Sequence, residues 1–232
     1  MYLSYYDSFL TIGLLILGFV ICTFAQIKIS STYAKYKKIR SSSEKTGEDV
    51  AVAILNKNGL NDITVNAVVG NLTDHYSPGR KEINLSEDVY GGISIASLAI
   101  AAHECGHAIQ KKEKYAFYNM RTALVPVVNA INYLGYFGIL VSLFAGYFQY
   151  VKLAIFVVLA TLVFQLITLP VEFDASRRGK EQLLEMGYIT KEEEQGVSKV
   201  LSAAAFTYVA GVISSILQVL RLVLILNSRR RD

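Results

Sequence analysis

Two histidines and one glutamate stand together in the stretch AAHECGHAIQ, residues 101–110. His103 and His107 are four positions apart, so on a helix their imidazoles lie on one face and could bind one metal ion. Glu104 is turned partly around that helix, which would bring its carboxylate near a water on the ion. Zinc lowers the pKa of a bound water to about 7, so Glu104 could act as general base. The stretch has the H-E-x-x-H pattern of zinc peptidases and predicts a hydrolytic Zn²⁺ site.

A structural interpretation of the same stretch has to be weighed. A five-residue pattern with three fixed positions also arises by chance, and its polar side chains could form the solvent-exposed end of an amphipathic helix. The chain has only three histidines, however, and two of them fall in the pattern. They follow an apolar segment and have small neighbours, as such sites require. These observations favour the metal site.

A catalytic zinc usually has three protein ligands, so a third must come from elsewhere. No histidine follows His107 at the G-x-x-H spacing. Glu172 lies two residues after Pro170, at the end of an apolar run, where an unpartnered carboxylate is costly and a zinc ion would be a partner. Pairing of Glu172 with a nearby arginine is the alternative account, and His75 is the rival third ligand.

The composition indicates a membrane protein. The chain is 53% hydrophobic and only 18% charged, with a mean hydropathy of +0.37. That is too apolar for an ordinary soluble domain. A helix needs about 20 apolar residues to cross a bilayer, and four uncharged runs are long enough. They predict four crossings, or three and an interfacial helix: 8–27, 122–151, 153–171 and 200–220. The first run is predicted to be a retained anchor, because it lacks a basic residue before it and a clear cleavage site after it.

The histidine motif follows a shorter uncharged run, 89–102, which is too short for a span. The segment 93–112 therefore predicts a helix that does not cross, capped by Ser94. Segment 43–60 predicts an amphipathic helix, and segments 63–70 and 81–87 predict short strands around a turn at Pro78-Gly79. The expected fold is a mainly α membrane protein with a small α+β catalytic region.

Lysine and arginine predict the orientation. Many follow the first run and none precedes it, so 28–121 is expected in the cytoplasm and the N-terminus outside. The predicted organisation begins with an anchor (1–27) and a cytoplasmic catalytic region (28–121). A membrane hairpin (122–171) follows and turns outside near 149–152. A cytoplasmic helical segment with the third ligand (172–199) and a last helix with a basic tail (200–232) complete the chain. The tail NSRRRD would lie outside, against the positive-inside rule.

The basic stretch 28–45 is predicted to bind anionic lipid headgroups and not nucleic acid, because it directly follows a membrane span.

Three separated motifs carry a family resemblance: AAHECGHAIQ, LTDHYSPGRKEINLSEDVYGG and LPVEFDASRRG. Together they resemble the bacterial membrane zinc metallopeptidases often labelled YugP-type, a neutral zinc metallopeptidase family. More distantly, the layout is similar to the HtpX and CAAX-prenyl-protease class of gluzincins. The resemblance implies His103, His107 and Glu172 as zinc ligands and Glu104 as the base.

The chain departs from the wider gluzincin class at one position. Where that class has an aspartate four residues after the glutamate ligand, this chain has Ser176, and an aspartate occurs instead at Asp174. Either side chain could support a ligand histidine. His75 or Tyr76, just before the Pro78-Gly79 turn, could stabilise a developing oxyanion, and the strand EINL could pair with an extended substrate.

The sequence thus predicts a multi-pass zinc endopeptidase of the bacterial cell membrane, with its active site facing the cytoplasm. Its partners would be the lipid bilayer and peptide segments of membrane or membrane-adjacent proteins. The alternatives are a zinc-binding scaffold without proteolytic activity and an intramembrane protease of the site-two type. The natural substrate and the oligomeric state leave no signal in the sequence.

Overall fold

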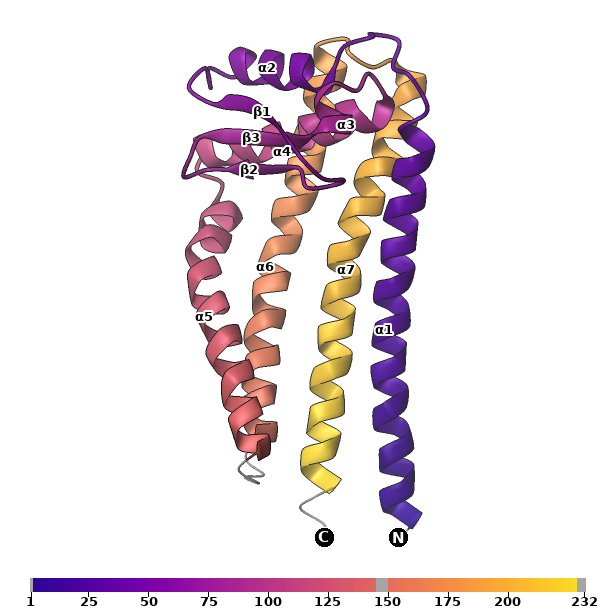
Figure 1. Ribbon diagram of the computed structural model, residues 1–232, viewed down its shortest axis with the longest axis vertical. Coiled ribbons are helices and arrows are strands. Elements are labelled where there is room, and N and C mark those ends of the chain that lie inside the picture. The colour runs from indigo at the N-terminus through magenta and orange to yellow at the C-terminus, as the bar shows by residue number, and fades with distance from the viewer. Residues whose placement is uncertain (1, 145–149, 229–232) are drawn as a thin grey trace. The chain divides into compact units, whose positions relative to one another are not determined.

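The computed structural model describes residues 2–144 and 150–228. Its elements are mostly helices, with one small sheet, as the sequence predicts for a mainly α protein. In chain order they are α1 (Tyr2–Tyr36), α2 (Gly47–Lys57), β1 (Thr64–Val68), β2 (His75–Ser77), β3 (Glu82–Ser86), α3 (Glu87–Tyr90), α4 (Ile95–Lys112), α5 (Ala116–Phe144), α6 (Tyr150–Glu185) and α7 (Lys191–Ser228) (Figure 1).

Three described helical segments are long and apolar enough to cross a membrane: Phe9–Tyr36, Val151–Glu185 and Lys191–Ser228. They contain the first, third and fourth uncharged runs. The second run begins in α5 and continues through residues 145–149, which lie outside the described residues, so a fourth crossing stays a prediction. The expected outside turn near 149–152 and the end of the basic tail, 229–232, also fall wholly or partly outside the described residues.

The chain divides into two compact units. The first unit comprises Met1–Gln26, Met120–Leu169 and Thr207–Asp232, and its described part is helical. Large hydrophobic side chains on it are exposed, among them Phe19 at 72% and Leu134 at 65%. Apolar surface of this kind suits contact with lipid, because in water it would promote association.

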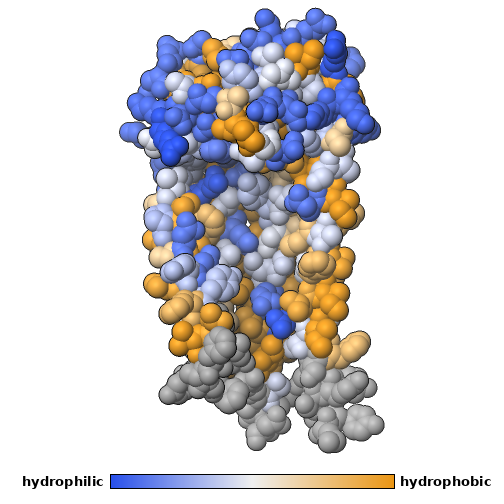
Figure 2. Space-filling view, viewed as in Figure 1, coloured by the Kyte–Doolittle hydropathy of each residue, from blue (hydrophilic) through white to orange (hydrophobic). Residues whose placement is uncertain are grey.

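The second unit comprises Ile27–Asn119 and Pro170–Phe206, and it contains the sheet. The strand order is β1-β3-β2, with β1 parallel and β2 antiparallel to β3. The central strand is the most deeply buried, and Ile83 and Leu85 are fully enclosed in a hydrophobic core that also includes Leu98 and Leu183. Figure 2 shows hydrophilic side chains gathered over the strands and α2.

Local signals locate two helices of this unit, α2 and α4, whereas the short helix α3 was not predicted. Thr46 caps α2 and accepts a hydrogen bond from the amide of Asp49 at 3.0 Å, whose carboxylate in turn accepts from the Thr46 amide. Ser94 caps α4 by accepting from the amide of Ser97 at 3.1 Å. These caps satisfy backbone groups that a helix end leaves without partners. The predicted boundaries of α2 and α4 are confirmed to within a few residues.

The sheet differs from the prediction in two ways. Strand β2 lies in the segment that was expected to be a connection, because three residues carry too little periodicity to be recognised and are ordered by pairing with β3. Strand β3, which contains EINL, has a neighbour on each side and therefore no free edge. The expectation that EINL pairs with a substrate backbone is wrong; β2 is an edge strand instead.

Helices α4 and α6 cross closely, and glycine makes this possible. A Cβ added at Gly106 would collide with the carbonyl oxygen of Ala175, and one added at Gly179 would lie 2.6 Å from that of Ala102. Each helix thus contributes a glycine where the other backbone approaches. The close crossing brings the α4 histidines beside the part of α6 that follows Pro170.

Candidate metal centre

The crossing of α4 and α6 brings together two imidazoles and one carboxylate. The Nε2 atoms of His103 and His107 lie 3.4 and 3.8 Å from Oε2 of Glu172. Candidate ligand atoms of the three residues all lie within 4.8 Å of one another. The Glu172 side chain is only 3% exposed, and those of His103 and His107 are 16% and 9% exposed. The three ligands implied by the sequence therefore form one buried cluster.

The geometry of this cluster fits a zinc ion. Tetrahedral coordination with bonds of about 2.1 Å places ligand atoms roughly 3.4 Å apart. The two distances to Glu172 are close to that spacing. Two imidazoles and a carboxylate are also a donor set used by catalytic zinc, which keeps a fourth position for water or substrate. The residues present therefore fit the metal that the pattern predicts.

Ser176 supports His103. Its hydroxyl oxygen lies 3.1 Å from Nδ1 of His103 and one helical turn from Glu172. When Nδ1 carries the proton, it donates to Ser176 and leaves the Nε2 lone pair for a metal. A partner on the outer nitrogen in this way fixes both tautomer and ring orientation. Ser176 thus contacts His103 from the position at which the wider gluzincin class has an aspartate.

Gln110 supports His107 in the same way, and the sequence interpretation assigned it no role. Its Oε1 lies 3.0 Å from Nδ1 of His107, while its Nε2 donates to the Val171 carbonyl at 2.8 Å and to Asp174 at 2.9 Å. The two acceptors orient the amide so that its oxygen faces the imidazole. Gln110 is fully buried. The i, i+3 spacing from His107 was the signal that could have revealed it.

Asp174 therefore contacts the histidines only through an intermediary. Its carboxylate accepts from Gln110 and is paired with Arg177 at 2.6 Å and Arg178 at 2.5 Å. Arg178 also pairs with Glu113, just after α4. Arg177 and Arg178 are the nearby arginines that could have been alternative partners of Glu172. Both form ion pairs with Asp174 and hold its carboxylate in place.

Glu104 is buried on α4, next to the candidate ligand His103, and lies near β2. The backbone of Tyr76 in β2 is close enough to lower the pKa of this carboxyl group. Burial raises the pKa of Glu104 to about 7; the nearby His103 lowers that pKa and the Glu172 carboxylate raises it. A divalent cation bound beside it would favour the ionised form. A carboxylate in this position is suited to exchange protons with a metal-bound water.

His75 and Tyr76 lie on β2, but His75 is not part of the ligand cluster found among the described residues. The His75 side chain is exposed, with Nδ1 2.8 Å from the Thr73 carbonyl oxygen and Nε2 3.2 Å from the Asn84 amide nitrogen. Tyr76 is half-buried, and burial and the nearby Tyr118 raise its pKa to about 12. Its hydroxyl therefore stays protonated and able to donate.

Tyr118 is a second residue that the sequence interpretation missed. It is only 5% exposed, and its ring centroid lies 6.3 Å from that of His107. It follows the end of α4 by six positions, in a segment without any recognisable motif. No sequence signal distinguishes it from the other tyrosines of the chain. It becomes a candidate only because the turn after α4 returns it to the histidine.

The role of Gln110 can be tested by replacing it with methionine, which keeps its volume but cannot accept a hydrogen bond. We expect zinc affinity to fall by about 10- to 100-fold, the usual cost of losing an outer partner of a ligand histidine. Competition with a chromophoric chelator would measure it. The unfolding midpoint of the zinc-free protein would identify a merely structural defect. Unchanged zinc affinity in the variant would contradict the assignment.

Two comparisons with known proteins find a match. Residues 11–227 match the model of a protein family described as "Putative neutral zinc metallopeptidase". The chain is also 46% identical over 222 residues to the "Putative membrane protease YugP" of Bacillus subtilis (strain 168), covering 95% of this chain and 97% of that protein. No solved structure gives a significant match.

Proposed function

The chain belongs to the neutral zinc metallopeptidase family whose model it matches, and on this premise we propose that it is a membrane zinc endopeptidase. The observation that carries the proposal is the cluster of His103, His107 and Glu172 with Glu104 beside it. A purely structural zinc site would not require a buried carboxylate next to its ligands. The name of the B. subtilis relative, a membrane protease, supports the same activity.

In the proposed mechanism, His103, His107 and Glu172 hold the zinc ion. Zinc, when bound, polarises the scissile carbonyl and lowers the pKa of water. Glu104 removes a proton from the attacking water as its oxygen bonds to the carbonyl carbon. It then delivers that proton to the leaving amine nitrogen as the C–N bond breaks. Tyr76, Tyr118 and His75 are the candidates to stabilise the negative charge that develops on the carbonyl oxygen.

A peptide substrate is supported by the position of β2. This strand is at the edge of the sheet, and the backbone of its Tyr76 lies near the Glu104 carboxylate. An extended chain laid along that edge would pass the carboxylate that handles the proton. Backbone pairing of this kind depends little on side chains. We therefore expect cleavage of unfolded or extended segments with weak sequence preference.

We also propose that the protein is multi-pass and that its site faces the cytoplasm. The three candidate spans support membrane insertion, and the lysines after the first run support the orientation. A cysteine introduced at exposed Lys45, in a chain without Cys22, should resist an impermeant thiol reagent in intact cells and react after lysis. Labelling in intact cells would reverse the assigned topology.

The proposed activity is tested by removing the metal. Protein purified in detergent with zinc should cleave an unfolded protein substrate, lose at least 90% of that activity with a strong zinc chelator, and recover it when zinc is restored, since water activation depends on the ion. Gel analysis of the fragments over time would measure cleavage. A protein that binds zinc stoichiometrically but cleaves nothing would be the non-proteolytic scaffold.

A further inference from the structure

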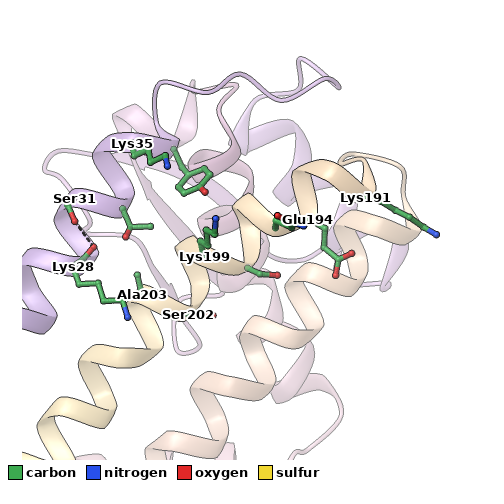
Figure 3. Close-up of a pocket in the computed structure, with 12 residues that line it drawn as sticks. Lys28, Ser31, Lys35, Lys191, Glu194, Lys199, Ser202 and Ala203 are labelled. Carbon is green, nitrogen blue, oxygen red and sulfur yellow. Dashed lines mark hydrogen bonds between the residues drawn. The ribbon is translucent and has the colours of Figure 1, made fainter.

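A cavity of the site-bearing unit lies between α1 and α7 (Figure 3). It has a volume of about 870 Å³. Lys28 and Lys35 line it from α1, and Lys191 and Lys199 line it from α7. Figure 3 shows Lys28 extending from α1 toward α7, whereas Lys191 stands at the opposite end of the cavity. We call this the lysine cavity.

The lysine cavity is positively charged. Its one acidic lining residue, Glu194, already forms an ion pair with Lys180 at 3.0 Å. Within the part of the chain that the structure describes, no ion pair joins any of the four lysines of the cavity to a carboxylate. Like charges gathered in a concave surface raise the local potential and attract anions. The lysine cavity is therefore suited to bind a negatively charged ligand.

The remaining lining groups suit a phosphate. Hydroxyl groups come from both helices, with Ser31 and Thr32 on α1 and Ser198 and Ser202 on α7. The Ser31 hydroxyl donates to the Lys28 carbonyl at 3.1 Å, and its oxygen can still accept. Ammonium and hydroxyl donors arranged around one space match the several acceptor oxygens of a phosphate ester.

The place of the cavity along the helices indicates the source of that phosphate. Lys28 is the first charged residue after the uncharged run 8–27, and both helices belong to candidate membrane spans. The Lys28 ammonium lies 4.5 Å from the ring centroid of Phe206, and neighbouring Ile27 is 60% exposed. Charged donors thus directly adjoin apolar surface, as a molecule with a phosphate head and hydrocarbon tails requires.

We propose that the lysine cavity binds the phosphate of an anionic phospholipid. The inference does not depend on peptidase activity, since none of its residues belongs to the metal centre. The phosphate would lie among Lys28, Lys35 and Lys199, and the acyl chains would leave the cavity beside the exposed side chain of Ile27. The bound lipid would contact both α1 and α7.

The test uses the full-length protein, delipidated in detergent and titrated with phosphatidylglycerol or phosphatidylcholine. Native mass spectrometry would count the lipids retained. We expect a preference for phosphatidylglycerol, and a loss of about tenfold or more in its affinity in the double variant Lys28→Gln, Lys199→Gln, because each juxtamembrane lysine contributes appreciably to anionic lipid binding. Zinc content equal to wild type would show that the variant is folded.

The matched control is Lys38→Gln, Lys45→Gln, which removes the same charge from exposed positions outside the cavity. Lipid affinity within about twofold of wild type in the control would support a specific site. An equal loss of affinity in both variants would show that the lipid is held by general charge attraction, and would overturn the proposal. Inorganic phosphate or glycerol phosphate that displaces the lipid at equal concentration would show that a free anion is the ligand and reject the lipid. Unaltered lipid binding in the cavity variant would reject the site itself.

Discussion

Replacing Glu104 with glutamine is expected to lower the rate of peptide cleavage by about 10²- to 10⁴-fold, the usual contribution of a general base. Glutamine keeps the size of the side chain, but it cannot take up the proton of the attacking water. The ligand atoms on His103, His107 and Glu172 are untouched. Zinc should therefore remain bound while turnover is lost.

Two measurements make this prediction decisive. Cleavage of a fluorogenic unfolded substrate gives the rate, and metal analysis of the same preparation gives the zinc content. Glu87→Gln is the matched control, because Glu87 is an exposed acid of the same unit, and it should retain full activity. Equal cleavage by wild type and the Glu104 variant would remove the assigned base and with it the proposed mechanism.

The second large effect is expected from Glu172→Ala. Glu172 is the only ligand of the cluster from α6, and its carboxylate lies between both imidazoles. Its removal leaves two protein ligands where catalytic zinc usually has three. The loss in zinc affinity should exceed the 10- to 100-fold typical of losing an outer partner, and activity should disappear with the metal.

His75→Ala and Glu181→Ala are the controls for this variant. His75 is the rival third ligand, and Glu181 is a half-exposed acid of α6 that pairs with Arg177. Both should bind one zinc per chain with affinity near wild type, measured by chelator competition. Full occupancy in Glu172→Ala together with loss in His75→Ala would show that the third ligand comes from β2 and not from α6.

The features that the sequence alone could predict are those that depend on nearby residues. The i, i+4 spacing of His103 and His107 fixes their common face on any helix. The caps at Thr46 and Ser94 act within three residues, and the uncharged runs predict apolar helices through length and composition alone. The mainly α class and the H-E-x-x-H pattern on α4 follow from such local rules.

The convergence of groups from distant segments was decided only by the tertiary structure. Glu172 reaches the histidines because α4 and α6 approach closely at Gly106 and Gly179, and no periodicity predicts which backbones will meet. The same packing links His107 through Gln110 to Asp174. Family resemblance named the candidate ligands, but the hydrogen bonds to their side chains form only once the helices have packed. The sequence by itself therefore determined which reactive side chains are present and how they are spaced along each helix. The tertiary structure decided which of them are close enough to act together.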